Sequence, residues 1–509
     1  MRYSGTYDLL VVGGGINGAG IARDAAGRGL SVLLCEQDDL AAHTSSASTK
    51  LIHGGLRYLE QLQFSLVRKA LIEREILLGS APHLMRPLRF VLPHDARQRP
   101  AWMISAGLFL YDHLARRRRL AGSARVDLRR HVAGAALKTQ YVKGFVYSDG
   151  WTDDARLVVL NAIDARERGA LILTRTRCEK LEAERDHWVA TLAGASGPQT
   201  ISARAVVNAT GPWVSRFARE AAPVSVCHSV RLVKGSHIVV PQLYAHRFAY
   251  LFQNDDRRIV FAIPYEREFT LIGTTDVEYT GDPSAVRIAS DEIEYLCAAV
   301  SRYFAKPVRP DDVVWSYSGV RPLLDDDAAD PATVTRDYAL ELEQHPAPIL
   351  NVFGGKITTY RKLAESAVDI LARELGSRAS AWTAHALLPG GDLPRGNYAR
   401  FLRSLERAYP WLPPTLRYRY AHAYGTRVAH ILGGARSVAD LGEELLPQLY
   451  EREADYLCYV EMAQTAEDIL WRRTRLGLHV ERGATGRLQE WLARRNSHAS
   501  GTEHRPVTA

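Results

Sequence analysis

The first 36 residues alternate between apolar runs and a stretch of small residues. The run YDLLVV at 7–12 is bounded by glycines, which is typical of a strand buried in a parallel sheet. We expect a helix over 17–28 and a second strand over 30–36, LSVLLCE. Strand, helix and strand in this order predict a βαβ unit and an α/β fold.

Farther along the chain, helix and strand patterns mix. Residues 157–169 have helical spacing, and 203–213 predict a strand that runs into a turn. Residues 258–276 predict two strands joined at 265–268, and 356–375 predict a long helix that ends before Gly376. We therefore expect a mixed-sheet portion beside the N-terminal βαβ unit.

The chain is too long for one hydrophobic core, since it has 509 residues. A stretch rich in Pro and Gly at 387–396 marks a change of pattern, and helical spacing dominates beyond it. We expect a first domain over 1–385, which holds the nucleotide-binding and substrate-binding portions. An all-helical domain over 386–496 and a disordered polar tail over 497–509 follow in this division.

Charge and cysteine usage narrow the class of protein. The net charge of +8 favours anionic partners, which include a phosphorylated substrate, an acidic membrane surface and nucleic acid. The five cysteines are scattered without a CxxC pair, so we expect no disulfide framework, no metal site and a reducing compartment. A strand-like run from residue 7 leaves no room for a signal peptide, and we expect no membrane-spanning helix.

A glycine motif lies between the first strand and the first helix. Gly13 permits a tight turn, Gly15 lets a pyrophosphate approach the backbone, and Gly18 lets helix and strand pack closely. Glu36 ends the second strand, where an acid accepts a ribose 2′-hydroxyl. The pattern predicts a Rossmann-like dinucleotide site. The turn VVNATGPW at 206–213, with Gly211, is similar to a second contact of FAD-dependent enzymes and favours FAD over NAD.

Several longer segments together resemble one family, the aerobic FAD-dependent glycerol-3-phosphate dehydrogenases of respiratory membranes. The matching segments include GGGINGAGIARDAAGRGLSV, TSSASTKLIHGGLRYLE, VNATGPWV, RLVKGSHIVV, IGTTDVEY, YSGVRPL, TRDY and VFGGKITTYRKLAE. The resemblance implies oxidation of sn-glycerol 3-phosphate to dihydroxyacetone phosphate. FAD would take a hydride from C2 at its N5 atom, and membrane quinone would take the electrons, in glycerol catabolism and respiration.

The same resemblance implies a set of cofactor contacts beyond the glycine motif. Serine hydroxyls of TSSAST would line the flavin and its pyrophosphate, a glycine pair would let the chain pass under the ring, and GGKITT would aim a helix N-terminus at it. The residues are Asn17, Ser45, Ser46, Ser48, Gly54, Gly55, Gly354, Gly355 and Thr358, and Thr49 would line the flavin with the three serines. An ordinary helix N-cap is the alternative for 45–49.

A phosphate substrate needs cationic donors, and bidentate arginine suits it best. The candidates for binding substrate are Arg57, Tyr58, Thr274, Arg321, Arg336 and Lys356. Arg321 and Lys356 are also assigned to catalysis. TRDY around Arg336 has an ion-paired turn as its alternative.

One histidine is assigned to proton transfer. His237, which follows a glycine and precedes a strand-like run, is our candidate for the general base that takes the C2 hydroxyl proton. His53 is the alternative base, and Asp276 is a candidate for positioning the substrate or the flavin.

Residues 100–119, PAWMISAGLFLYDHLARRRR, combine an apolar stretch with four arginines. This pattern is typical of an interfacial segment on an anionic leaflet, and a buried helix with an exposed basic end is the alternative. We expect a cytoplasmic protein that lies peripherally on the cytoplasmic face of the inner membrane. The sequence does not decide whether it forms a homodimer.

Two rival functions remain. A flavin oxidase that passes electrons to oxygen would share the fold, and the residues do not distinguish oxygen from quinone. A nucleic-acid-binding flavoprotein would suit the charge, but no such motif occurs and aromatic residues do not alternate with the basic runs, so we expect no nucleic-acid partner.

Overall fold

The computed structural model describes residues 5–95, 99–222, 224, 226–256, 258–325, 337–481, 483 and 485–499. Arg336 and residues 500–509 lie outside this range. The chain divides into two compact units, one of Met1–Ala81 and Met85–Leu387 and one of Pro82–Leu84 and Leu388–Ala509. The division after Leu387 is close to the expected boundary at 385/386, but the sequence did not predict the transfer of Pro82–Leu84 to the second unit.

The first sheet of the larger unit is mainly parallel and contains the predicted βαβ unit. Its strand order is β17-β18-β10-β1-β2-β7, and β9 pairs with β10 and β8 at the side. The strands are β1 (Thr6–Val12), β2 (Val32–Cys35), β7 (Leu171–Leu173), β8 (Arg177–Glu184), β9 (His187–Gly194), β10 (Gly197–Asn208), β17 (Tyr338–Glu343) and β18 (Ile349–Gly354). Leu9 of β1 pairs with Val32 of β2 on one side and with Ala205 of β10 on the other, all in parallel. The central strands are buried on both faces, which explains their continuous apolar runs.

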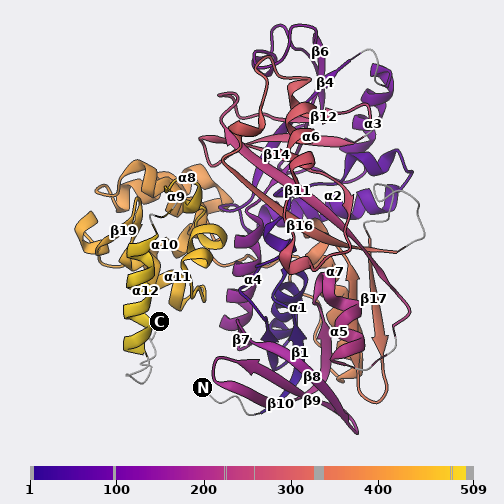
Figure 1. Cartoon of the computed structure of the whole chain (residues 1–509), viewed down its shortest axis with the longest axis vertical. Helices are drawn as coiled ribbons and strands as arrows, with labels where there is room; N and C mark the ends of the chain where they lie inside the picture. Colours follow the sequence, from indigo (N-terminus) through magenta and orange to yellow (C-terminus); the bar gives the residue numbers. More distant parts are fainter. Residues whose placement is uncertain are drawn as a thin grey trace. The chain divides into compact units, whose positions relative to one another are not determined.

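Helix α1 (Ile16–Gly27) packs between α4 (Asp154–Glu167) and α7 (Tyr360–Glu374), and Figure 1 shows these helices beside β1. Gly20 makes the contact with α7 close, since an added Cβ would lie 2.8 Å from the Tyr360 ring. The long helix predicted over 356–375 begins as a 3-10 turn, η7 (Ile357–Thr359), before α7. Helix α5 (Val214–Glu220) follows the turn η4 (Gly211–Trp213) at the end of β10.

The second sheet is mixed and extends through the upper part of Figure 1. Its order is β15-β11-β14-β13-β12-β4-β6-β3, with β16 paired to β11 and β5 paired to β6. The strands are β3 (Leu51–Ile52), β4 (Arg86–His94), β5 (Ala124–Asp127), β6 (Lys143–Trp151), β11 (Val230–Pro241), β12 (Ala249–Gln253), β13 (Ile259–Tyr265), β14 (Phe269–Gly273), β15 (Val277–Glu278) and β16 (Trp315–Leu324). The hairpin predicted over 258–276 is β13–β14, with its turn as expected. Helix α6 (Ser290–Ser301) packs on β11, β13 and β14.

Two further helices and two short turns lie between β2 and β5 along the chain. They are α2 (Phe64–Ser80), α3 (Ala101–His113), η1 (Thr44–Ser46) and η2 (Leu56–Leu59). None of the helices among the described residues is long and apolar enough to cross a membrane.

The smaller unit has its own hydrophobic core, built around Tyr420, Tyr424 and Leu457. Its helices are α8 (Tyr398–Ala408), α9 (Pro414–Tyr424), α10 (Val428–Leu432), α11 (Glu451–Tyr459), α12 (Gly486–Ala499) and a π-helical segment, η11 (Asp468–Arg473). The expectation of an all-helical unit needs correction, because β19 (Glu444–Leu446) and β20 (Leu449–Tyr450) form a small antiparallel sheet. Helix α12 also continues past residue 496, where we expected the ordered chain to end.

Candidate functional site

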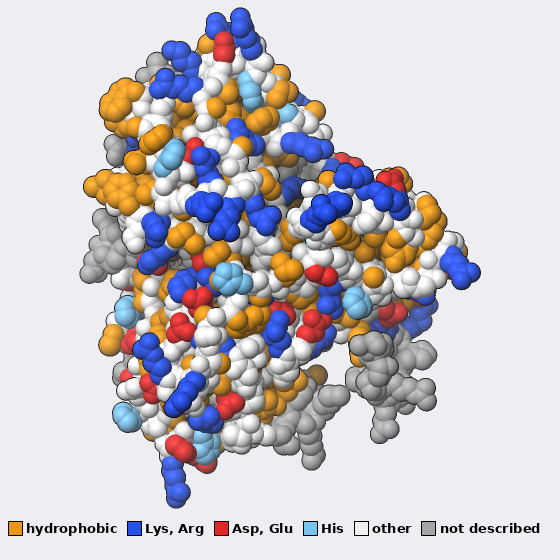
Figure 2. Space-filling view, turned by 180° about the vertical axis from the view of Figure 1, so that it is seen from behind, with side chains coloured by type: hydrophobic (Ala, Val, Ile, Leu, Met, Phe, Trp, Pro, Cys, Tyr) orange, Lys and Arg blue, Asp and Glu red, His pale blue; other side chains and the backbone are white. Residues whose placement is uncertain are grey.

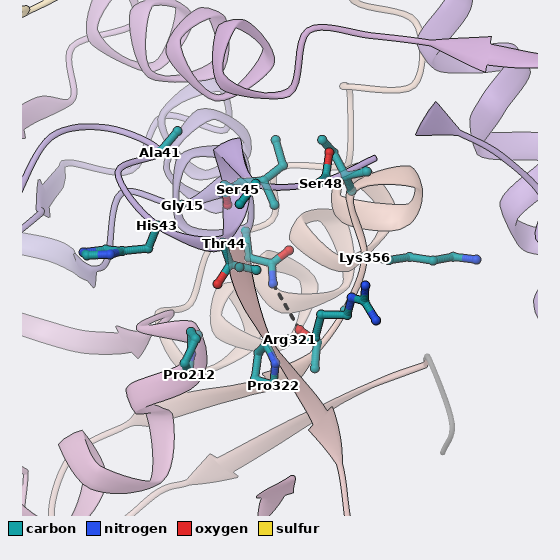
Figure 3. A pocket seen from close by; sticks show the side chains of 18 of the residues that line it. Gly15, Ala41, His43, Thr44, Ser45, Ser48, Pro212, Arg321, Pro322 and Lys356 are labelled. Atoms are coloured by element: carbon teal, nitrogen blue, oxygen red, sulfur yellow. Dashed lines mark hydrogen bonds between the residues drawn. The ribbon is translucent and has the colours of Figure 1, made fainter. Parts of the chain in front are cut away.

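A cavity of about 720 Å³ opens at the carboxyl ends of β1, β2 and β10 and extends to the second sheet. Its volume is in the range of pockets that enclose cofactors and drug-sized ligands. Ligands of open α/β sheets bind at this edge because the strand ends and the helix N-termini meet there. Figure 3 shows a close view of the lining, in which Arg321 and Lys356 extend on the side away from His43 and Pro212.

The glycine motif shapes the end of the cavity next to α1. Gly13 has a φ of 113°, and an added Cβ would lie 2.5 Å from the Ala209 carbonyl oxygen. An added Cβ at Gly18 would overlap the Gly13 carbonyl oxygen, so Gly18 serves helix–strand packing and does not line the cavity. Gly15 lines the cavity at the start of α1. The helix N-terminus and the open backbone at Gly15 fit a pyrophosphate.

Glu36 lies at the end of β2, where its carboxylate accepts from the amides of Gly14 at 2.6 Å and Asp38 at 2.9 Å. Burial raises the pKa of Glu36, and the two amide donors oppose that rise. Ligand atoms of Asp38 and His43 lie within 4.8 Å of the Glu36 carboxylate and one another, a grouping that could hold a metal ion. Because backbone amides already occupy the Glu36 oxygens, the position fits a ribose hydroxyl better than a cation.

Asn17, Gly354 at the end of β18 and Gly355 after it also line this part of the cavity. Asn17 Nδ2 donates to the Gly354 carbonyl at 3.4 Å. Asn17 Oδ1 is enclosed and has no hydrogen-bond partner among the described residues. An added Cβ at Gly355 would lie 2.9 Å from Leu363 and 3.2 Å from Asn17. An enclosed acceptor beside bare backbone fits a bound group that donates a hydrogen bond.

The serines of the segment 44–50 use their hydroxyls within the protein. Ser45 Oγ accepts from the Ile16 amide at 3.0 Å, so it meets α1 at its N-terminus. Ser48 Oγ donates to Asp154 at 2.8 Å, although Ser48 lines the cavity. Ser46 Oγ donates to the His43 carbonyl at 3.1 Å, and the residue lies outside the lining. The expectation that all three hydroxyls face the cofactor therefore needs correction for Ser46.

Glycine is required at 54 and at 55 for two different structural reasons. An added Cβ at Gly54 would lie 2.5 Å from Leu71 and 2.8 Å from Tyr111, and the Gly54 amide donates to the Tyr111 hydroxyl at 2.8 Å. Packing against α2 and α3 therefore requires Gly54, which is not part of the lining. Gly55, with a φ of 79°, turns the chain at the cavity wall against the Tyr58 ring.

Thr358 is also placed differently from the expectation. It is buried behind the wall, where its hydroxyl accepts from the His53 amide at 3.2 Å. The lining does include Gly211, at the turn after β10.

The cationic candidates that the structure describes all line the cavity. Arg57, Tyr58, Thr274, Arg321 and Lys356 all line it, whereas Arg336 lies outside the described residues. The Lys356 ammonium is 5.1 Å from the centre of the Tyr58 ring. η2 and the residue that precedes η7, which are far apart in the chain, thus meet at the cavity wall.

Arg321 is held by a carboxylate and by two neighbouring oxygen atoms. Its guanidinium forms an ion pair with Asp276 and donates to Thr274 Oγ1 at 2.8 Å and to the Thr275 carbonyl at 3.3 Å. These partners lie just after β14, next to β11, with which β16 pairs. The guanidinium is thereby fixed in orientation while its side chain stays 22% exposed.

His237 lies on β11 at the cavity wall, and its residue is 1% exposed. Nε2 is 2.9 Å from Thr49 Oγ1, and the ring stacks on Tyr317 with centroids 4.8 Å apart. Burial, followed by the charges of Arg321 and Lys50, holds the pKa of His237 well below its usual value of 6.5. The imidazole is therefore neutral at neutral pH and able to accept a proton. The alternative, His53, also lines the cavity.

Three residues near the site were missed in the sequence, Lys50, Asp154 and Tyr317. Lys50 and Asp154 form an ion pair whose side chains are both 0% exposed. Tyr317 Oη donates to the Ser48 carbonyl at 2.8 Å. Lys50 has a positive φ and Asp154 begins a helix, and both are local features of the backbone. Neither feature predicts that the two side chains pair.

Comparisons with known proteins agree with this geometry. Residues 8–361 match the family model described as FAD dependent oxidoreductase, and residues 381–493 match the C-terminal domain of alpha-glycerophosphate oxidase. The chain is 53% identical over 495 residues to a glycerol-3-phosphate dehydrogenase of Pseudomonas aeruginosa, covering 97% of this chain and 96% of the relative. It is 50% identical over 491 residues to the aerobic glycerol-3-phosphate dehydrogenase of Escherichia coli, covering 96% and 97%.

Two further comparisons bear on substrate and cofactor. A D-erythritol 1-phosphate dehydrogenase of Brucella abortus is 49% identical over 494 residues, covering 96% of this chain and 98% of the relative. The solved glycerol-3-phosphate dehydrogenase of Bacillus halodurans, complexed with FAD, superposes with a TM-score of 0.78 at 30% identity and covers 97% of this chain and 91% of that chain.

Proposed function

Since the chain belongs to the FAD-dependent glycerol-3-phosphate dehydrogenase family, we propose that it oxidises sn-glycerol 3-phosphate to dihydroxyacetone phosphate. It is an FAD-dependent oxidoreductase. The observation that carries the substrate proposal is that Arg57, Arg321 and Lys356 line the same cavity as His237 and the glycine motif. FAD, when bound, supplies the two-electron acceptor for the alcohol carbon.

The cationic residues bind the phosphate in this proposal. A phosphate dianion is matched best by the planar guanidinium fork, and Arg321 is already oriented by Thr274 and Asp276. Lys356 adds a point charge above the Tyr58 ring, and Arg57 adds another from η2. The fixed orientation of Arg321 reduces the entropy lost on binding, because less side-chain freedom remains to be frozen.

His237 accepts the C2 hydroxyl proton in this proposal. Burial and the neighbouring cations favour its neutral form, which is the form a general base requires. The same cations repel the imidazolium that proton transfer creates, so the basicity of His237 is moderate. A phosphate dianion bound to Arg321 would offset part of that repulsion and raise the basicity when substrate is present.

A four-carbon polyol phosphate is the second candidate substrate, favoured by the 49% identity to the Brucella enzyme. The test is kcat/KM for sn-glycerol 3-phosphate, D-erythritol 1-phosphate and glycerol. We expect sn-glycerol 3-phosphate to be preferred and glycerol to be turned over at least a thousandfold less well, because it lacks the group that the cations bind. A preference for the four-carbon substrate would change the substrate assignment, and turnover of glycerol at a comparable rate would overturn the phosphate site.

We further propose that the protein lies on the cytoplasmic face of the inner membrane and passes electrons to quinone. Helix α3 supports this, since Leu108 and Tyr111 are its buried residues while Trp102 is 65% and Phe109 61% exposed. The alternative of a buried helix does not suit this exposure. Near the start of α2, Leu62 is also 73% exposed. Figure 2 shows large hydrophobic side chains along one edge of the upper part, among many Lys and Arg side chains.

Vesicle binding tests the membrane proposal. The variant Trp102→Ser/Phe109→Ser should lose most binding to vesicles that contain phosphatidylglycerol, because aromatic side chains anchor interfacial helices. Val132→Ser, at another exposed apolar position, is the matched control and should bind normally. Equal vesicle binding by the wild type, the double variant and the Val132→Ser control would contradict the role of α3. The electron acceptor is identified by two measurements on turnover, the yield of hydrogen peroxide and the reduction of a soluble quinone. Quinone reduction with little peroxide indicates quinone as the acceptor, and a high peroxide yield indicates oxygen.

A further inference from the structure

A buried ion pair holds the segment 46–50 against α4. Lys50 Nζ donates to Asp154 Oδ1 at 2.7 Å and to the Ser46 carbonyl at 3.1 Å, and both charged side chains are fully buried. Asp154 Oδ2 accepts from the Ser48 hydroxyl at 2.8 Å and from its amide at 3.1 Å. Asp154 Oδ1 also accepts from the Ala155 amide at 2.9 Å. Every polar atom of this carboxylate is therefore engaged in holding the segment.

The other side of the segment contacts His237 and its neighbour. Thr49 Oγ1 is 2.9 Å from His237 Nε2, and the Tyr317 hydroxyl donates to the Ser48 carbonyl at 2.8 Å. Tyr317 stacks on the His237 ring with an interplanar angle of 14°, and the Lys50 ammonium lies 5.0 Å from the centre of the Tyr317 ring. The imidazole is thus held at its edge by Thr49 and on one face by Tyr317.

The nitrogens of His237 differ in their surroundings. Nδ1 is enclosed and has no hydrogen-bond partner among the described residues, whereas Nε2 contacts Thr49, which itself lines the cavity. The charged groups that face this ring are Lys50, paired with Asp154, and Arg321, paired with Asp276. Among the described residues, the polar contact that links the ring to another residue of the cavity lining is therefore the one between Nε2 and the Thr49 hydroxyl.

We propose that Thr49 and the Lys50–Asp154 pair are positioning residues for the reaction, which hold His237 neutral and in one orientation at the cavity wall. This inference rests on the proposed role of His237 as base. Thr49 fixes the ring through Nε2, the ion pair fixes Thr49, and the Lys50 charge disfavours the imidazolium. Asp154 acts from α4, on the far side of the segment from the cavity.

Thr49→Val is the first test, because it removes the hydroxyl and keeps the shape of the side chain. We expect kcat to fall about 10- to 100-fold with KM little changed and flavin retained, since a small displacement of a general base costs about that much. Thr49→Ser should restore kcat to within about threefold, because it returns the hydroxyl. Thr270→Val is the matched control, since Thr270 is buried in the same sheet, outside the cavity lining, and accepts from the Leu243 amide at 3.1 Å.

The pH dependence of kcat is the second test, with the double variant Lys50→Met/Asp154→Asn. Its acid limb should move to higher pH, because the cation that opposes protonation of His237 is gone and no uncompensated carboxylate is left. A merely structural role for the pair would not move the limb. Wild-type kcat in Thr49→Val, or an unmoved acid limb in a flavin-loaded double variant, would overturn the inference.

His237→Gln separates this inference from the proposed function. If His237→Gln keeps wild-type kcat, the role of His237 as base falls and the inference falls with it. If His237→Gln loses kcat while Thr49→Val matches the wild type, only the positioning inference falls. Should the double variant fail to bind flavin, Thr49→Val and Thr49→Ser still decide the question.

Discussion

Replacing Arg321 with alanine removes a proposed phosphate contact whose guanidinium is held in place by neighbouring side chains. The guanidinium is held by the Asp276 ion pair and by Thr274 at 2.8 Å, so it is arranged before substrate arrives. Hydrogen bonds between charged groups contribute about 1.5–3 kcal/mol each. The side chain is 22% exposed, so we take a loss of about 3 kcal/mol, the lower end for two bonds. At about 1.4 kcal/mol per factor of ten, this is roughly a hundredfold loss in kcat/KM for Arg321→Ala.

The assay is steady-state turnover of sn-glycerol 3-phosphate by protein of known flavin content. Arg321→Lys should lose less, about tenfold, because an ammonium keeps the charge but not the fork. Arg231→Ala is the matched control. Arg231 is also a strand arginine paired with an acid, Glu278, in the same sheet, but it does not line the cavity. A kcat/KM for flavin-loaded Arg321→Ala within threefold of wild type would refute the assignment of Arg321 to the phosphate.

Three other predictions concern cofactor retention and stability. Gly18→Ala should lose FAD and about 1–3 kcal/mol of stability, because its Cβ overlaps the Gly13 carbonyl; Gly107→Ala, in open space on α3, should keep FAD in the same visible-spectrum assay. Tyr111→Phe should lower the free energy of unfolding in denaturant by about 2 kcal/mol, since Asp149 and the Gly54 amide lose a buried partner; an unchanged midpoint would contradict this. The pKa of His237 is lowered in the folded state, so the unfolded protein binds a proton more readily below about pH 6.5. The free energy of unfolding should therefore be fully retained above about pH 6.5 and should fall by up to about 1.4 kcal/mol per pH unit as the pH drops toward the folded-state pKa. Stability curves of wild type and His237→Gln that stay parallel below pH 6.5 would rule this out.

Local sequence patterns were sufficient to predict the fold of the nucleotide-binding core. The apolar runs of β1 and β2 are continuous because both faces of those strands are buried, and the glycine spacing between strand and helix reflects contacts within a few residues. The β13–β14 hairpin and the turn after β10 were predicted for the same reason. Family, fold class, FAD and the kind of enzyme are confirmed by the comparisons.

Contacts between distant residues could not be predicted from local pattern. Lys50 and Asp154 are 104 positions apart, and Gly54 meets Tyr111 across 57 positions. The sequence therefore suggested a flavin contact for Gly54, whereas packing against α2 and α3 requires it. Arg321 was a candidate for binding the substrate, but the carboxylate that orients it, Asp276, lies 45 positions earlier. Which polar groups satisfy one another is decided by the tertiary fold.

The proposed substrate is tested most directly by the visible spectrum of the purified protein under anaerobic conditions, before and after addition of sn-glycerol 3-phosphate. We expect a yellow protein whose flavin absorption bleaches on addition of substrate, because the alcohol carbon gives two electrons to the bound cofactor. An intact flavin that stays oxidised with sn-glycerol 3-phosphate would leave the fold standing and would contradict the proposed substrate.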